Sequence, residues 1–179
     1  RVQENARKAS DMQGYHTDGA GRQVFTDTRA VFRLSKPVEG LEAADANATW
    51  PAKVEPLFEH VKKEESVALG REEIAEMVER GKRVRGKRAA DVPEIITKVG
   101  QAYVDSTRLG EVLSVLGTDE VTAYTSKPVA GESGRRYYSN VYFSSANGEA
   151  LLAPVHLGDA EARAVDSYYK DAATAVRSE

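Results

Sequence analysis

The sequence contains no cysteine among its 179 residues. Disulfides, thiolate metal sites and a cysteine nucleophile are therefore excluded. No apolar run approaches the length that a membrane-spanning helix needs, and no basic-then-apolar leader is visible. We therefore expect a soluble, cytoplasmic protein that does not contact a membrane.

Charge is nearly balanced, with a formal net charge of −3, and hydrophobic residues make up 41% of the chain. This composition predicts one cored domain, or one domain with part of another. Basic residues nevertheless concentrate in one short stretch. They are Arg80, Lys82, Arg83, Arg85, Lys87 and Arg88. A mildly acidic protein with such a stretch can present a local face to a polyanion.

Residues 102–157 carry the clearest pattern, one strand, one helix and then three strands. Asp105 or Ser106 is expected to cap the helix, and Gly117 to end it. The apolar residues of the helix recur at the spacing of a single buried face. They are Leu109, Val112, Leu113 and Leu116.

The three strands that follow this helix show an alternation of period two around Val121 and Val141. Asn147-Gly148 predicts a type I′ hairpin turn, because both central positions of that turn need positive φ. The last strand, residues 150–157, should therefore pair antiparallel with the strand before it.

The N-terminal part of the chain predicts a weak helix over residues 1–12 and a hairpin with a turn at residues 18–21. A third strand is expected over residues 30–34. Residues 35–49 are acidic and broken by proline and glycine, which indicates an exposed connection.

The middle of the chain predicts partial helix over residues 50–61, which Pro56 should interrupt or begin. A strand is expected at residues 66–69 and a helix at residues 71–82. Residues 91–99 suit either a helix start or a strand. The tail from Asp159 has the spacing of an amphipathic helix.

The order of these elements, and the ending EALLAPVHL, resembles the repeating half-domain of bacterial-type DNA polymerase sliding clamps, whose last strand ends in a Met-Pro-x-Arg-Leu-like sequence. The matching residues here are Ala153, Pro154, Val155, His156 and Leu157. Upstream, GYHTDGAGRQVFTDTRAVFRL is similar to the clamp hairpin with its Thr-Asp-Gly-His-Arg-Leu motif. KVEPLFEHVKKEESVALGREEIAEMVERGKRV is similar to the segment, strand and helix that follow.

The chain also departs from the clamp pattern. Thr28 stands at a glycine-like position, Arg29 at the histidine position and His156 at the terminal arginine position. Residues 84–101 are too few for an additional strand hairpin that the family carries there. The chain is about half the length of a typical clamp subunit, so we expect a shortened, divergent member encoded by a phage or mobile element.

The resemblance implies an α+β fold with antiparallel sheets and helices on one face, built from sliding-clamp-like half-domain repeats with an extra C-terminal helix. Three parts are expected. They are an N-terminal hairpin region with the acidic connection (residues 1–49), a clamp-like domain (residues 50–158) and a C-terminal amphipathic helix (residues 159–179).

The resemblance also implies a non-catalytic replication processivity factor that self-associates around double-stranded DNA. Its DNA contacts would come from the basic stretch Arg80 to Arg88 and from Arg108, meeting phosphates without reading bases. Alternatively, these basic residues would only complement a helix dipole and keep a loop solvated.

Sliding clamps bind short peptide motifs of DNA polymerases and repair proteins in an apolar groove, and the resemblance places such a groove beside the last strand. Its residues would be Thr26, Arg29, Val31, Val67, Leu151, Leu152, Pro154 and Val155. We expect Leu152 to be an exposed anchor for the peptide. Alternatively, Leu151 and Val155 alternate as the core-facing residues of any strand do.

The sequence shows no recognisable pattern of catalytic residues. His16, His60 and His156 fall on different elements without metal-ligand spacing. The exposed loop at residues 131–136 has two bases that would either touch phosphate or be solvated. We expect no catalytic residue, no metal and no cofactor.

A second hypothesis comes from a different class. The chain would be an interaction protein, for example a virion or regulatory protein, that keeps the clamp-like fold without a ring or a DNA role. Fold alone does not choose between the two hypotheses. Ring closure needs edge strands at both ends of the domain to pair with neighbours.

Overall fold

The computed structural model describes residues 2–10, 14–88, 90–117 and 119–177. Its strands are β1 (Tyr15–Thr17), β2 (Gln23–Thr26), β3 (Ala30–Leu34), β4 (Glu65–Leu69), β5 (Ile96–Val99), β6 (Ala102–Asp105), β7 (Val121–Thr125), β8 (Val129–Ala130), β9 (Arg136–Tyr137), β10 (Val141–Ser145) and β11 (Gly148–Leu152). Its helices are α1 (Val2–Ser10), α2 (Trp50–His60), α3 (Arg71–Arg83), the 3-10 helix η1 (Pro93–Ile95), α4 (Ser106–Leu116) and α5 (Asp159–Arg177).

A seven-stranded sheet in the order β1-β2-β3-β11-β10-β7-β4 forms the centre of the molecule, and all of its strand pairs are antiparallel. The strands β5 and β6 form a separate hairpin, and β8 and β9 form another. The expected α+β class with antiparallel sheets is confirmed.

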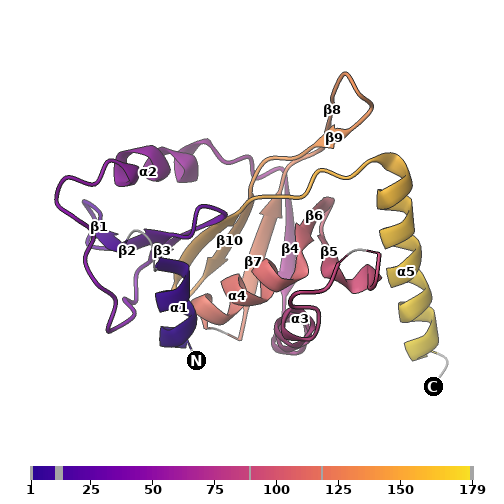
Figure 1. Ribbon diagram of the computed structural model, residues 1–179, viewed down its shortest axis with the longest axis horizontal. Coiled ribbons are helices and arrows are strands. Elements are labelled where there is room, and N and C mark those ends of the chain that lie inside the picture. Colours follow the sequence, from indigo (N-terminus) through magenta and orange to yellow (C-terminus); the bar gives the residue numbers. More distant parts are fainter. Residues whose placement is uncertain (1, 11–13, 89, 118, 178–179) are drawn as a thin grey trace.

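Helices cover both faces of this sheet (Figure 1). Ala6 of α1, Ile74 of α3 and the buried residues of α4 pack into one core, on one face. Phe58 of α2 packs on the other face, with Tyr142 and Leu151. The expectation that helices lie on one face is therefore wrong for α2, which follows a short exposed connection and carries its own apolar stripe.

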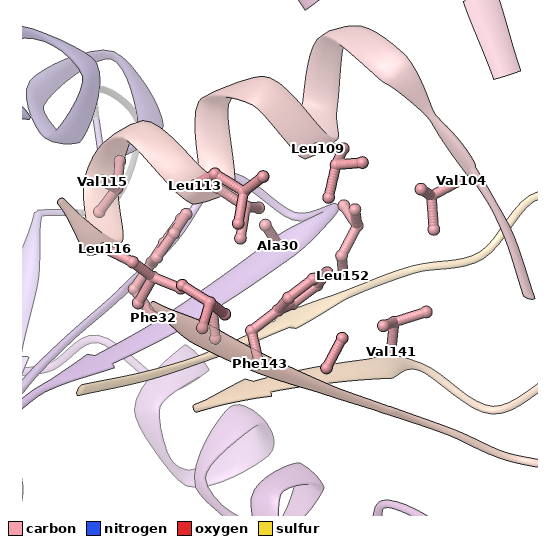
Figure 2. Packing of buried hydrophobic residues seen from close by; sticks show 14 of the residues in the cluster. Ala30, Phe32, Val104, Leu109, Leu113, Val115, Leu116, Val141, Phe143 and Leu152 are labelled. Carbon is pink, nitrogen blue, oxygen red and sulfur yellow. The ribbon is translucent and has the colours of Figure 1, made fainter. Parts of the chain in front are cut away.

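The predicted organisation of residues 102–117 is confirmed. The Asp105 carboxylate accepts a hydrogen bond from the Arg108 backbone N–H at 3.0 Å, so Asp105 caps α4. Gly117 ends the helix at φ +60°, and its N–H donates to Leu113 O. Leu109, Leu113 and Leu116 point onto the sheet and are at most 1% exposed (Figure 2).

The expected type I′ turn is not formed. Gly148 pairs with Ser145 in the ladder, so Ala146 and Asn147 occupy the turn, and neither has a positive φ. The Asn147 side chain instead donates to Leu116 O at 2.8 Å and ties the hairpin to the end of α4. The last strand also ends earlier than expected, at Leu152.

The division expected at residue 49 does not divide the core, because β3 pairs with β11 along its whole length. Residues 91–99 combine both alternatives, with η1 followed by β5. Pro56 lies inside α2 and does not interrupt it. The predicted terminal helices correspond to α1 and α5, with residues 1, 11–12 and 178–179 outside the described part of the chain.

Candidate nucleic-acid interface

The basic residues predicted to bind DNA lie around the C-terminal end of α3 and the first turn of α4. These two helices lie side by side on the sheet, and Gly81 of α3 faces Gly110 of α4. Arg80, Lys82 and Arg83 belong to the last turn of α3, where cations complement the helix dipole. The remaining bases of the stretch follow in the turn after α3.

Arg80 is held inside the protein. Its Nη1 donates to Thr97 Oγ1 and to Tyr169 Oη, each at 3.2 Å, and its guanidinium lies 4.9 Å from the centroid of the Tyr169 ring. Its side chain is only 14% exposed. Arg80 therefore joins α3 to β5 and α5, and it presents little charge to an external phosphate.

Lys82 and Arg83 are half-exposed and each faces a carboxylate. Lys82 Nζ lies 2.7 Å from Glu79 Oε1, and Arg83 Nη2 lies 3.0 Å from Glu94 Oε2. The hydrogen bond from Tyr168 lowers the pKa of Glu94, burial opposes the change, and Arg83 lowers it further. The same bond raises the pKa of Tyr168 to about 12, and burial adds to that rise.

Arg85 and Arg108 share one carboxylate. Arg85 Nη2 lies 3.2 Å from Glu111 Oε1, and Arg108 Nη1 lies 3.3 Å from Glu111 Oε2. Arg108 also donates to Asp27 Oδ2 at 2.9 Å. Asp27 comes from the turn between β2 and β3, so Arg108 links α4 to the N-terminal hairpin.

Lys87 and Arg88 differ from the other basic residues that were predicted to bind DNA. Both are exposed, and neither forms a side-chain bond within the described residues. Five of the seven predicted cations thus face carboxylates, which leaves Lys87 and Arg88 without a carboxylate partner in the described part of the chain. The carboxylates are Asp27, Glu76, Glu79, Glu94 and Glu111. Asp91 lies in the same turn, and its backbone N–H donates to Arg88 O at 2.9 Å.

The helix faces themselves carry no net charge. The sequence of α3 has four bases and four acids, and that of α4 has one of each. Within this helix pair, the cations without a carboxylate partner are therefore confined to the turn after α3. Sequence spacing gave a signal only for the acids three or four residues from a base, such as Glu79 and Lys82. Asp27 is distant in sequence from Arg108, Glu94 from Arg83 and Glu111 from Arg85, and periodicity did not reveal these three pairs.

The predicted peptide groove is not formed. Thr26, Val31, Leu151 and Leu152 are at most 8% exposed, and Leu152 points toward α4 in the core (Figure 2). The expectation that Leu152 is an exposed anchor is wrong, because β3 and β11 are neighbours inside the sheet and not an open edge.

The other predicted groove residues lie at the margin of this region. Arg29 is exposed, Val67 packs against the main core from β4, and Pro154 is half-buried. Val155 packs with α5 and β6 in a third apolar cluster. The eight residues therefore do not line one surface.

The histidines of the described residues are scattered. His16 lies 3.1 Å from Glu55, and His156 lies against the Tyr137 ring. The described part of the chain brings no three His, Cys, Asp or Glu side chains together as metal ligands. Within the same residues, no helix is long and apolar enough to cross a membrane.

No protein-family model, curated protein or solved structure matches this chain. The likeness to sliding clamps therefore rests on the sequence motifs.

Proposed function

We propose that this protein is a non-catalytic, sliding-clamp-like DNA-associated factor that meets the phosphate backbone through the turn after α3. The clamp-like motifs support the class of protein. The observation that carries the DNA contact is the pair of exposed cations without a carboxylate partner, Lys87 and Arg88, beside two helices on one face of an antiparallel sheet.

The basic residues that are paired with carboxylates can contact DNA only if a phosphate replaces the carboxylate. Lys82, Arg83 and Arg85 are 42%, 46% and 54% exposed, and ion pairs at such positions contribute only about 0–1 kcal/mol. A phosphate can therefore replace the carboxylate at small cost, but the displaced carboxylate then repels the phosphate. We expect weak, sequence-independent binding whose salt dependence reflects mainly Lys87 and Arg88.

The experiment is a titration of a fluorescent DNA duplex at several KCl concentrations. For two phosphate contacts, the slope of log K against log[salt] should be about −2. The double variant Lys87→Gln, Arg88→Gln should bind more weakly on every sequence, with a slope near zero.

The matched control is Lys53→Gln with Lys62→Gln. It removes the same charge from exposed positions in and just after α2, on the opposite face of the sheet. It should leave the slope unchanged. Equal weakening by the two double variants would show that net charge, and not this turn, drives binding, and the proposal would fail.

A second candidate is an interaction protein without a DNA role. It is favoured because five of the basic residues predicted to bind DNA are paired with carboxylates. The sheet edges favour it too. The outer side of β1 is bonded to its own chain, from Tyr15 N to Glu42 O at 2.9 Å and from Ala44 N to Tyr15 O at 2.8 Å. β4 is the other edge. A ring needs two complementary edges, so occupation of the first disfavours closure.

Solution mass separates the two candidates. A ring-forming factor should have the mass of a closed oligomer. It should keep that mass when duplex DNA is added. A monomer or dimer without measurable duplex affinity at low salt would exclude the clamp-like factor and favour the interaction protein.

A further inference from the structure

The β8–β9 hairpin projects from the sheet, between β7 and β10 in the chain (Figure 1). Val129 and Tyr137 are direct cross-strand partners in it. They are 58% and 44% exposed, which makes them the two most exposed large hydrophobic residues of the described chain. Such a pair at the surface indicates contact with another molecule.

The Tyr137 ring is positioned although it is exposed. It lies against the backbone of Gly131, where any Cβ would collide with the ring. The His156 ring lies 5.0 Å away, with 50° between the ring planes. The hairpin therefore holds an aromatic surface in place without burying it, and little conformational entropy remains to be lost on binding.

Cations surround this aromatic surface. Lys127, Arg135 and Arg136 are all exposed. Arg136 Nε lies 3.6 Å from Asp159 Oδ1, while Lys127 and Arg135 form no side-chain bond within the described residues. The nearby carboxylates are Glu132, Asp159 and Glu64, which accepts a hydrogen bond from the Lys127 backbone N–H at 3.3 Å. The charges therefore balance, and Lys127 and Arg135 are the two cations whose side chains have no carboxylate partner in the described part of the chain.

We propose that the β8–β9 hairpin binds single-stranded nucleic acid, with one base stacked on Tyr137 and the flanking phosphates on Lys127 and Arg135. An exposed aromatic ring among cations is the combination that sequence-tolerant single-strand binding uses. Duplex bases are already stacked on each other and cannot use the ring. The surface is separate from the proposed duplex contact, because the hairpin and α3 lie at opposite sides of the molecule (Figure 1).

The test is fluorescence anisotropy with labelled oligothymidine at low salt. Tyr137→Ala should weaken binding by about tenfold or more, since one stacked base is lost, whereas Tyr137→Phe should bind like the wild type. A sugar–phosphate strand without bases should bind the wild type as weakly as oligothymidine binds Tyr137→Ala. Arg135→Gln should make the salt slope shallower by about 0.7, the single-strand value for one phosphate contact.

Leu57→Ala is the matched control, because Leu57 is 39% exposed on α2 and lies away from the hairpin. It should leave oligothymidine binding unchanged. The proposal fails if Tyr137→Ala binds oligothymidine as the wild type does, or if the strand without bases binds equally well. Either result would show that the Tyr137 ring does not stack on a base. Thermal unfolding of each variant shows that it is folded.

Discussion

Gly81 of α3 lies so close to α4 that a Cβ at this position would stand 2.7 Å from Ser106 O and 3.3 Å from Gly110 Cα. The two helix backbones are therefore in near contact. This contact positions the last turn of α3, and with it the start of the cationic turn.

Gly81→Ala should destabilise the protein, because the Cβ meets rigid backbone and α3 must move away from α4. Such overpacking costs about 1–3 kcal/mol, and the better helix propensity of alanine offsets up to about 1 kcal/mol of that. Urea unfolding measures the difference. Gly19→Ala is the control, since nothing lies within 4 Å of its Cβ position. An unchanged or raised stability of Gly81→Ala would contradict the close contact.

Leu152→Asp should prevent stable folding. Leu152 is 1% exposed in the main core, and a carboxylate there would be buried without a partner. We expect a loss of more than about 4 kcal/mol, seen as loss of cooperative thermal unfolding. Leu57→Asp, at an exposed position on α2, should unfold like the wild type. A folded, monomeric Leu152→Asp protein would restore the hypothesis of an exposed peptide groove.

Thr28→Gly should stabilise the protein. Thr28 has φ +76° in the turn between β2 and β3, a conformation that is unfavourable for a β-branched residue. Relief of this strain should gain about 1 kcal/mol, after the greater unfolded-state entropy of glycine is subtracted. The control is Arg29→Gly in the same turn, where φ is not positive, and it should not stabilise. Chemical denaturation compares them, and a destabilised Thr28→Gly would refute the strain.

Glu149→Gln should weaken the acid dependence of stability. Burial raises the pKa of Glu149, but hydrogen bonds from Arg33 and Tyr142 lower it further, so the folded value lies below the ordinary one. This stabilisation is present above the unfolded pKa of about 4.3 and is lost as pH falls through the folded pKa. The variant should be less stable by about 1–3 kcal/mol at pH 7.

The difference between Glu149→Gln and the wild type should then shrink as pH decreases below 4. Denaturant unfolding at pH 7, 5, 4 and 3 measures it. Comparison of the two proteins cancels the contribution of Glu94, whose pKa is also lowered. Asp18 is coupled to Glu149 because Arg22 lies 2.8 Å from Asp18 and 3.6 Å from Glu149, so the measured difference includes their interaction. A difference that stays constant with pH would show that the Glu149 charge does not contribute.

The local elements followed from the sequence because their causes act within a few residues. The Asp105 cap, the i, i+3, i+4 stripe of α4 and the left-handed Gly117 are each complete within one helix. The hairpin turn at residues 146–147 was misjudged by one position, because the Asn-Gly signal does not specify which two residues leave the ladder.

Tertiary structure decided the candidate sites. Alternation could not show that Leu151 and Leu152 are both buried, because that requires α2 on one face of the sheet and α4 on the other. The composition of the basic stretch did not reveal that Arg108 pairs with Asp27, 81 residues away. The sequence determined where cations and periodic apolar residues occur. Folding determined which of them remain exposed, because burial and ion pairing depend on neighbours that only the packed sheet brings together.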